Sequence, residues 1–127
     1  MKKPIVSAKG APPLGPYTPA ILASGPTLYI SAQGPIDPET GKFIAGAFRE
    51  QAILVLENIT SLLEAGNTSW DNVVKVTLFL EDMANFAEFN ELYAQYVTKP
   101  YPARTVAQSN LTIAAVAVDC IALVPDA

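Results

Sequence analysis

Two stretches of the chain carry apolar residues at every third or fourth position, which is the spacing of an amphipathic helix. The first stretch runs from Phe48 to Leu63, and Gly66 follows it as a stop signal. The second begins near Asp82 or Asn85, either of which is a suitable N-cap, and it ends before Pro100. Its apolar stripe consists of Phe86, Phe89, Tyr93 and Val97. The pattern therefore predicts two helices.

Short runs of apolar and β-branched residues flank these helices. They predict strands over residues 18–24, 27–33, 73–80, 103–108 and 113–124. Gly25-Pro26 divides the first two runs and predicts a hairpin between them, whereas the proline-rich residues 1–16 are expected to form an extended arm. The order β-β-α-β-α-β-β favours a single α+β domain, residues 1–127, with a mixed sheet that carries both helices on one face.

The composition narrows the class of protein. Half of the 127 residues are apolar, 16 % are charged, and the net charge is −4. Such an apolar chain is expected to bury some surface between subunits, and its negative charge disfavours nucleic acid or an anionic membrane as the main partner. Cys120 is the only cysteine, which excludes an intrachain disulfide. Because no apolar run suits a signal peptide or a membrane span, we expect a soluble, cytoplasmic protein.

The chain contains no histidine. This excludes Ser-His-Asp and Cys-His nucleophilic sites, and it also excludes the usual zinc sites. Any catalysis must therefore rely on carboxylates, hydroxyls, backbone groups or bound water.

A few residues do not match their predicted surroundings. Arg104 stands alone in an almost uncharged strand, where it either faces solvent or grips a small carboxylate. Asn90 lies on the apolar stripe of the second helix, either as a hydrogen-bonded core amide or as a group that orients a ligand. Tyr17 and Ser31 lie in a turn and at a strand end, where sites are common. Asp119 lies within an apolar strand, either in a structural salt bridge or in a site.

Several stretches resemble one family in order along the chain, from about Gly15 to Ala122. They are "GPYTPA", "SAQGPIDPETG", "QAILVLENITSLLEAGNTSWDNVVKVTLFLEDM", "FAEFNELYAQYV" and "YPARTVAQSNL". These motifs are similar to those of the RidA/YjgF family, the reactive-intermediate deaminases that are also called endoribonuclease L-PSP or translation inhibitor. The resemblance implies a chorismate-mutase-like α+β fold, assembled as a homotrimer with three clefts between subunits. It also implies hydrolysis of reactive enamines and imines, such as 2-aminoacrylate, without a cofactor.

The resemblance extends to individual residues. Arg104 matches the arginine that holds the substrate carboxylate in the family. Tyr17, Ser31 and Asn90 match positions that line the cleft, with Tyr17 implied to come from the neighbouring subunit. Val106 stands at a substrate-binding position where many members carry cysteine.

The last strand departs from the family pattern. Active deaminases usually carry a glutamate there that positions water, and Ala117 aligns with this glutamate. Asp119 follows two residues later on the same face of the strand, about 7 Å away.

Three functions are therefore compared. The first is hydrolysis of 2-imino acids to 2-oxo acids and ammonia. The second is binding of small carboxylate metabolites by a trimer with little or no catalysis, which Ala117 favours. The third is an endoribonuclease, and the missing histidine and the acidic chain make it the weakest.

Overall fold

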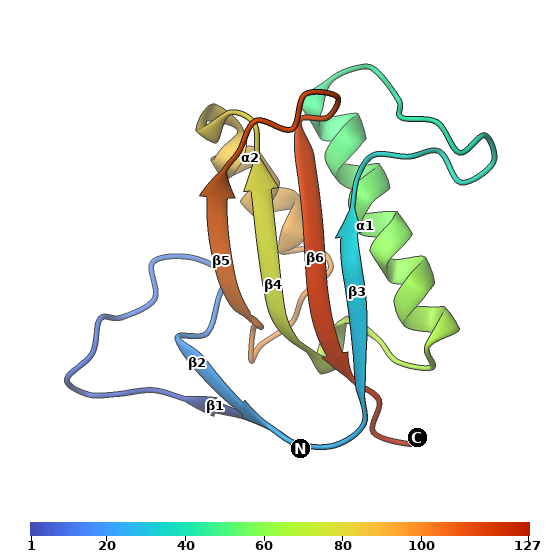
Figure 1. Cartoon of the computed structure of the whole chain (residues 1–127). Helices are drawn as coiled ribbons and strands as arrows, with labels where there is room; N and C mark the ends of the chain where they lie inside the picture. Colours follow the sequence, from blue (N-terminus) through green and yellow to red (C-terminus); the bar gives the residue numbers. More distant parts are fainter.

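The computed structural model describes residues 1–127 as a four-stranded sheet with two helices packed on one face (Figure 1). The helices are α1 (Phe48–Ala65) and α2 (Phe86–Tyr93). The sheet consists of β3 (Thr27–Gln33), β4 (Val73–Leu80), β5 (Ala103–Gln108) and β6 (Val116–Leu123). A separate two-stranded sheet consists of β1 (Lys2–Ile5) and β2 (Ala20–Ala23). Single 3₁₀ turns cover Trp70–Asn72 and Met83–Asn85.

The strand order β3-β6-β4-β5 makes the sheet mixed. β6 runs antiparallel to both β3 and β4, whereas β5 runs parallel to β4 after the α2 crossover. The α+β class, the mixed sheet and the placement of both helices on one face are therefore confirmed.

The hairpin predicted across Gly25-Pro26 is wrong. β2 pairs instead with β1, in a register from Lys2↔Ala23 to Ile5↔Ala20. Residues 1–16, expected to be an extended arm, thus contain a strand. Apart from half-buried Ile21, all of β2 is exposed, so little apolar surface ties it to the main sheet. The β2 residues themselves predict a strand, but they do not predict which strand it pairs with.

The core lies between the sheet and the helices. In β4 and β6, buried and half-buried side chains alternate along the strand, as expected when only one face of the sheet is covered. On α1 most of the predicted stripe is buried, through Ala52, Val55, Leu56, Ile59 and Leu63, whereas Leu62, also expected in it, is exposed.

The opposite side of the sheet carries no helix, and it faces the viewer in Figure 1. We call this side the open face; its side chains include Tyr29, Ser31, Lys75, Thr77, Phe79, Thr105, Ala117, Asp119 and Ile121. Tyr29 is 74 % exposed there. A large apolar ring in contact with solvent indicates surface suited to a partner.

Candidate functional site

Arg104 lies on the helix-covered face of the sheet, at the β5 edge, where α2 packs. Its Nη1 donates a hydrogen bond of 2.7 Å to Oδ1 of Asn90. The same guanidinium lies over two aromatic rings of α2, with Cζ 5.5 Å from the centroid of Phe86 and 5.2 Å from that of Tyr93. Arg104 and Asn90, each unusual in its own segment, are therefore direct partners.

No carboxylate neutralises Arg104 within the chain. The only ion pair is Arg49–Glu88, at 3.8 Å between exposed side chains. Burial lowers the pKa of Arg104 below its ordinary value, with smaller opposing contributions from Tyr93 and Tyr17. An arginine nonetheless stays protonated in proteins. The site thus presents a half-buried cation with a neutral amide as its only hydrogen-bond partner.

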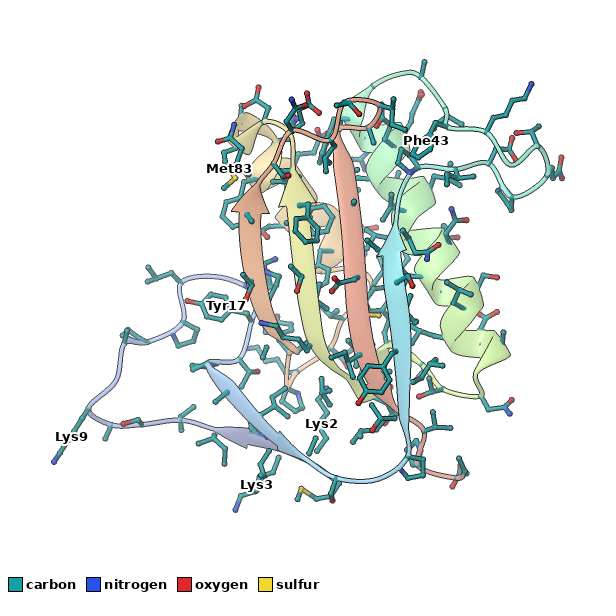
Figure 2. The ribbon with its side chains drawn as sticks, viewed as in Figure 1. Lys2, Lys3, Lys9, Tyr17, Phe43 and Met83 are labelled. Atoms are coloured by element: carbon teal, nitrogen blue, oxygen red, sulfur yellow. The ribbon has the colours of Figure 1, made fainter.

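Tyr17 lies near Arg104 of its own chain, beside the β5 edge in Figure 2. The segment at Gly15 lies between them, since a Cβ built on Gly15 would be 3.7 Å from Nη2 of Arg104 and 3.9 Å from the Tyr17 ring. The Tyr17 hydroxyl accepts a hydrogen bond of 3.2 Å from the Leu14 backbone N–H. One chain does not test the expectation that Tyr17 reaches the site of a neighbouring subunit, which stays a prediction.

Two grooves flank the Gly15 segment. One, of about 410 Å³, is lined by Gly15, Pro16, Asn90, Glu91, Ala94, Lys99 and Tyr101. The other, of about 530 Å³, is lined by four prolines and by Val6, Gly15, Tyr17, Thr18, Lys99 and Tyr101. Asn90 lines the first groove and Tyr17 lines the second, whereas Arg104 lines neither. Each groove has room for a small organic acid beside one of these predicted site residues.

A third cavity, of about 540 Å³, lies where α1 begins, between Phe43, Glu81 and Ile113. Figure 2 shows Phe43 near the end of β3, far from Tyr17. The cavity is similar in size to the grooves but contains none of the predicted site residues. We therefore place the candidate site at Arg104.

Ser31, Ala117 and Asp119 do not lie with Arg104 in one chain. Ser31 is exposed on β3, the opposite edge strand, and follows the buried Ile30, so it belongs to the open face. Ala117 and Asp119 lie opposite Phe79 and Thr77 on the same face. Asp119 makes no ion pair, so the structural salt bridge considered from the sequence does not form within the chain.

The remaining predicted position, Val106, packs partly buried against the core on the side of Arg104. Sequence reasoning assigned Phe86 and Tyr93 to the core and missed their contact with Arg104. A signal was present, because residues 86, 90 and 93 share one helical face and the middle one is polar.

No three histidine, cysteine, aspartate or glutamate side chains gather in a metal-binding arrangement. Neither helix combines the length and apolar character needed to cross a membrane.

Comparison with known proteins identifies the relatives of this chain. A family model described as endoribonuclease L-PSP matches residues 8–124. A RutC family protein of Pyrococcus horikoshii is 44 % identical over 108 residues, which cover 85 % of each protein. A human protein named 2-iminobutanoate/2-iminopropanoate deaminase is 37 % identical, over 85 % of this chain and 78 % of its own length.

Solved structures agree with these relationships. RidA from the Antarctic bacterium Psychrobacter sp. superposes with a TM-score of 0.72 at 35 % identity, covering 95 % of this chain and 98 % of its own. E. coli TdcF with bound serine gives a TM-score of 0.70 at 30 % identity, with the same coverage. The chain therefore belongs to the endoribonuclease L-PSP family, which is also known as the RidA/YjgF family.

Proposed function

We propose that this protein hydrolyses 2-imino acids, such as 2-aminoacrylate in its imine form, to 2-oxo acids and ammonia. The observation that carries the proposal is Arg104, a half-buried guanidinium that no carboxylate of the chain neutralises. A planar guanidinium binds a carboxylate through two parallel hydrogen bonds. The names of the human and bovine relatives, both 2-iminobutanoate/2-iminopropanoate deaminase, support the same substrate class.

The reaction needs few catalytic groups from the protein. Water oxygen bonds to the imine carbon, which is most electrophilic when the nitrogen is protonated, and the C=N bond becomes single. The nitrogen then takes up a proton and leaves as ammonia while the carbonyl forms. In this proposal Arg104 holds the carboxylate, and Asn90, Tyr17 and Ser31 orient substrate and water, so that positioning supplies most of the rate.

We further propose that the cleft is completed in a homotrimer. Ser31, Ala117 and Asp119 belong to the open face, whereas Arg104 lies on the other face at the β5 edge. A neighbouring copy that covers the open face would bring its own Arg104 edge toward these residues. The exposed Tyr29 supports such a contact.

Calorimetry with 2-oxobutyrate, a stable product analogue, tests the role of Arg104. Arg104→Ala is expected to weaken binding by about 10- to 150-fold, because a hydrogen-bonded charged pair contributes about 1.5–3 kcal/mol. Arg104→Lys should recover part of this loss. Arg49→Ala is the matched control, since Arg49 is the only other arginine and lies exposed in an ion pair. Equal affinity of Arg104→Ala and wild type would refute the proposed site.

A trimer that binds carboxylates without efficient catalysis is the second candidate, and Ala117 is the observation that favours it. Imine decay in an assay coupled to serine or threonine dehydratase separates the two functions. Faster imine decay in the presence of the wild-type protein supports the deaminase function. Decay at the uncatalysed rate, together with intact 2-oxobutyrate binding, supports the binder.

A further inference from the structure

The second helix surrounds Arg104 with three side chains of different chemistry. Phe86, Asn90 and Tyr93 are spaced by four and three residues, so they lie on one face of α2. Seven residues of helix rise about 10.5 Å, and Cζ of Arg104 lies at nearly equal distances from the two rings, 5.5 and 5.2 Å. The guanidinium is thus held between the first and the last of these residues, at the level of Asn90.

Aromatic rings stabilise a guanidinium without using its N–H groups. A carboxylate of the chain would stabilise the cation more strongly, but it would occupy the donors that a ligand needs. A ring face instead attracts the cation through its quadrupole, and the attraction strengthens as water is removed. Of the five guanidinium N–H donors, one is used by Asn90 and none by the rings. The charge is therefore stabilised while most donors stay free.

The ring of Tyr93 is fixed by its own neighbours. It is fully buried, stacks on Phe89 at 5.6 Å and meets Trp70 edge-on at 6.2 Å. Its hydroxyl has no hydrogen-bond partner, so the hydroxyl does not hold Arg104. The direct contact of Tyr93 with Arg104 is therefore made by the ring.

We propose that Phe86 and Tyr93 are positioning residues that fix the guanidinium plane of Arg104 and leave its free donors available to a substrate carboxylate. The proposal rests on the proposed function, because it assigns the ligand of Arg104 to a 2-imino or 2-oxo acid. It adds two residues that never touch the substrate but determine how tightly it binds.

The test combines 2-oxobutyrate calorimetry with the NMR signals of the arginine side chains. Since the chain has only two arginines, ¹⁵N-arginine labelling gives two Nε–H signals, and Arg49 serves as the reference. Tyr93→Leu and Phe86→Leu each remove a ring, whereas Tyr93→Phe keeps it. Leu92→Ala is the matched control, because it removes buried side-chain atoms from the same helix but no ring that contacts Arg104 or Tyr93.

Tyr93→Leu is expected to raise the Kd for 2-oxobutyrate about 5- to 30-fold, the range of one desolvated cation–π contact. The Arg104 Nε–H signal should move toward that of Arg49. Tyr93→Phe should stay within about twofold of wild type in Kd, which a role of the hydroxyl would not allow. Leu92→Ala should lower stability but leave both the Kd and the Arg104 signal unchanged.

Two results distinguish failure of this inference from failure of the proposed function. If Arg104→Ala abolishes binding while Tyr93→Leu and Phe86→Leu bind like wild type, the rings do not position the arginine, and the site stands. If Arg104→Ala binds normally, the proposed site itself is wrong. If Tyr93→Leu does not fold, Phe86→Leu remains as the test, because Phe86 is only half-buried. Wild-type affinity of Phe86→Leu for 2-oxobutyrate would then overturn the inference.

Discussion

We expect the residue at position 117 to limit how much catalysis the proposed cleft supports. It is half-buried on the open face, opposite Phe79, and no carboxylate stands at its position. Ala117→Glu is expected to accelerate imine decay, since one positioned acid–base group contributes about 10²- to 10⁴-fold. The larger side chain must fit where a methyl group was, so packing loss will reduce the gain. The dehydratase-coupled assay measures the rate.

Two controls accompany the Ala117 variant. Ala117→Gln has nearly the size of Glu but no acid–base group, so it should leave the rate unchanged. Asp119→Asn tests whether the neighbouring carboxylate already activates water. A large rate loss in Asp119→Asn, with no gain in Ala117→Glu, would contradict the importance of position 117.

Single residues were predicted from the sequence better than their partners were. Arg104 and Asn90 were each recognised as unusual, because a charge or an amide among apolar neighbours needs a partner. The hydrogen bond between them depends on how α2 packs on the sheet in the connection from β4 to β5. The periodicity of side chains along the sequence does not predict that packing. The Phe86 and Tyr93 contacts were missed for the same reason: an aromatic stripe usually means only core.

At the scale of elements, the start of α1 depends on contacts from outside the helix. Its N-cap, Ala47, has no side chain that can cap the helix. The buried Gln51 instead joins two loops, since it donates to the Gly46 carbonyl at 3.3 Å and accepts from the Ala115 N–H at 2.9 Å. The turn at Gly46, with φ of +135°, directs the chain into this arrangement.

Gly46→Ala is therefore expected to lower the free energy of unfolding by about 1–3 kcal/mol, the cost of a sparsely populated backbone conformation. Urea unfolding at fixed protein concentration measures it. Gly10→Ala is the control, because Gly10 does not have a positive φ and its new Cβ would meet Ser7 at 3.4 Å, an ordinary contact. Equal losses in both variants would show that backbone strain is not the cause.

Element types were predicted more reliably than element pairing. Both helices and the four strands of the main sheet were expected near their observed positions, because periods of 3.6 and 2 reflect which face is buried. The β2 partner was wrong, since sequence adjacency favours a hairpin but long-range pairing is chosen by burial. The second helix was expected to reach Val97, yet α2 ends at Tyr93 and single turns follow.

At the scale of the whole molecule, the open face is a sheet surface that no helix of the single chain covers. Its apolar members are Tyr29, Phe79, Ala117 and Ile121, and its charged members, Lys75 and Asp119, have opposite signs. Because these two charges balance, the face carries no net charge that would repel the Arg104 edge of a neighbouring subunit. The apolar content of the sequence predicted such a surface, but only the sheet topology shows where it lies.

The proposed trimer predicts that a charge on the open face will dissociate the protein. Wild type is expected to sediment as a trimer at micromolar concentration, whereas Tyr29→Asp should shift toward monomer, because assembly would bury an unpaired carboxylate. Tyr29 is 74 % exposed in the single chain, so the fold itself should tolerate the change. Ile53→Asp is the matched control, because Ile53 is 37 % exposed on α1, which packs over β3 and β6 and lies away from both the open face and the Arg104 edge. Sedimentation equilibrium measures the molecular mass of all three proteins in solution. A monomeric wild type would contradict the proposal of a cleft shared between subunits. A trimer that Tyr29→Asp leaves intact would instead place the subunit contact on another surface, and Ser31, Ala117 and Asp119 would then have no route to Arg104.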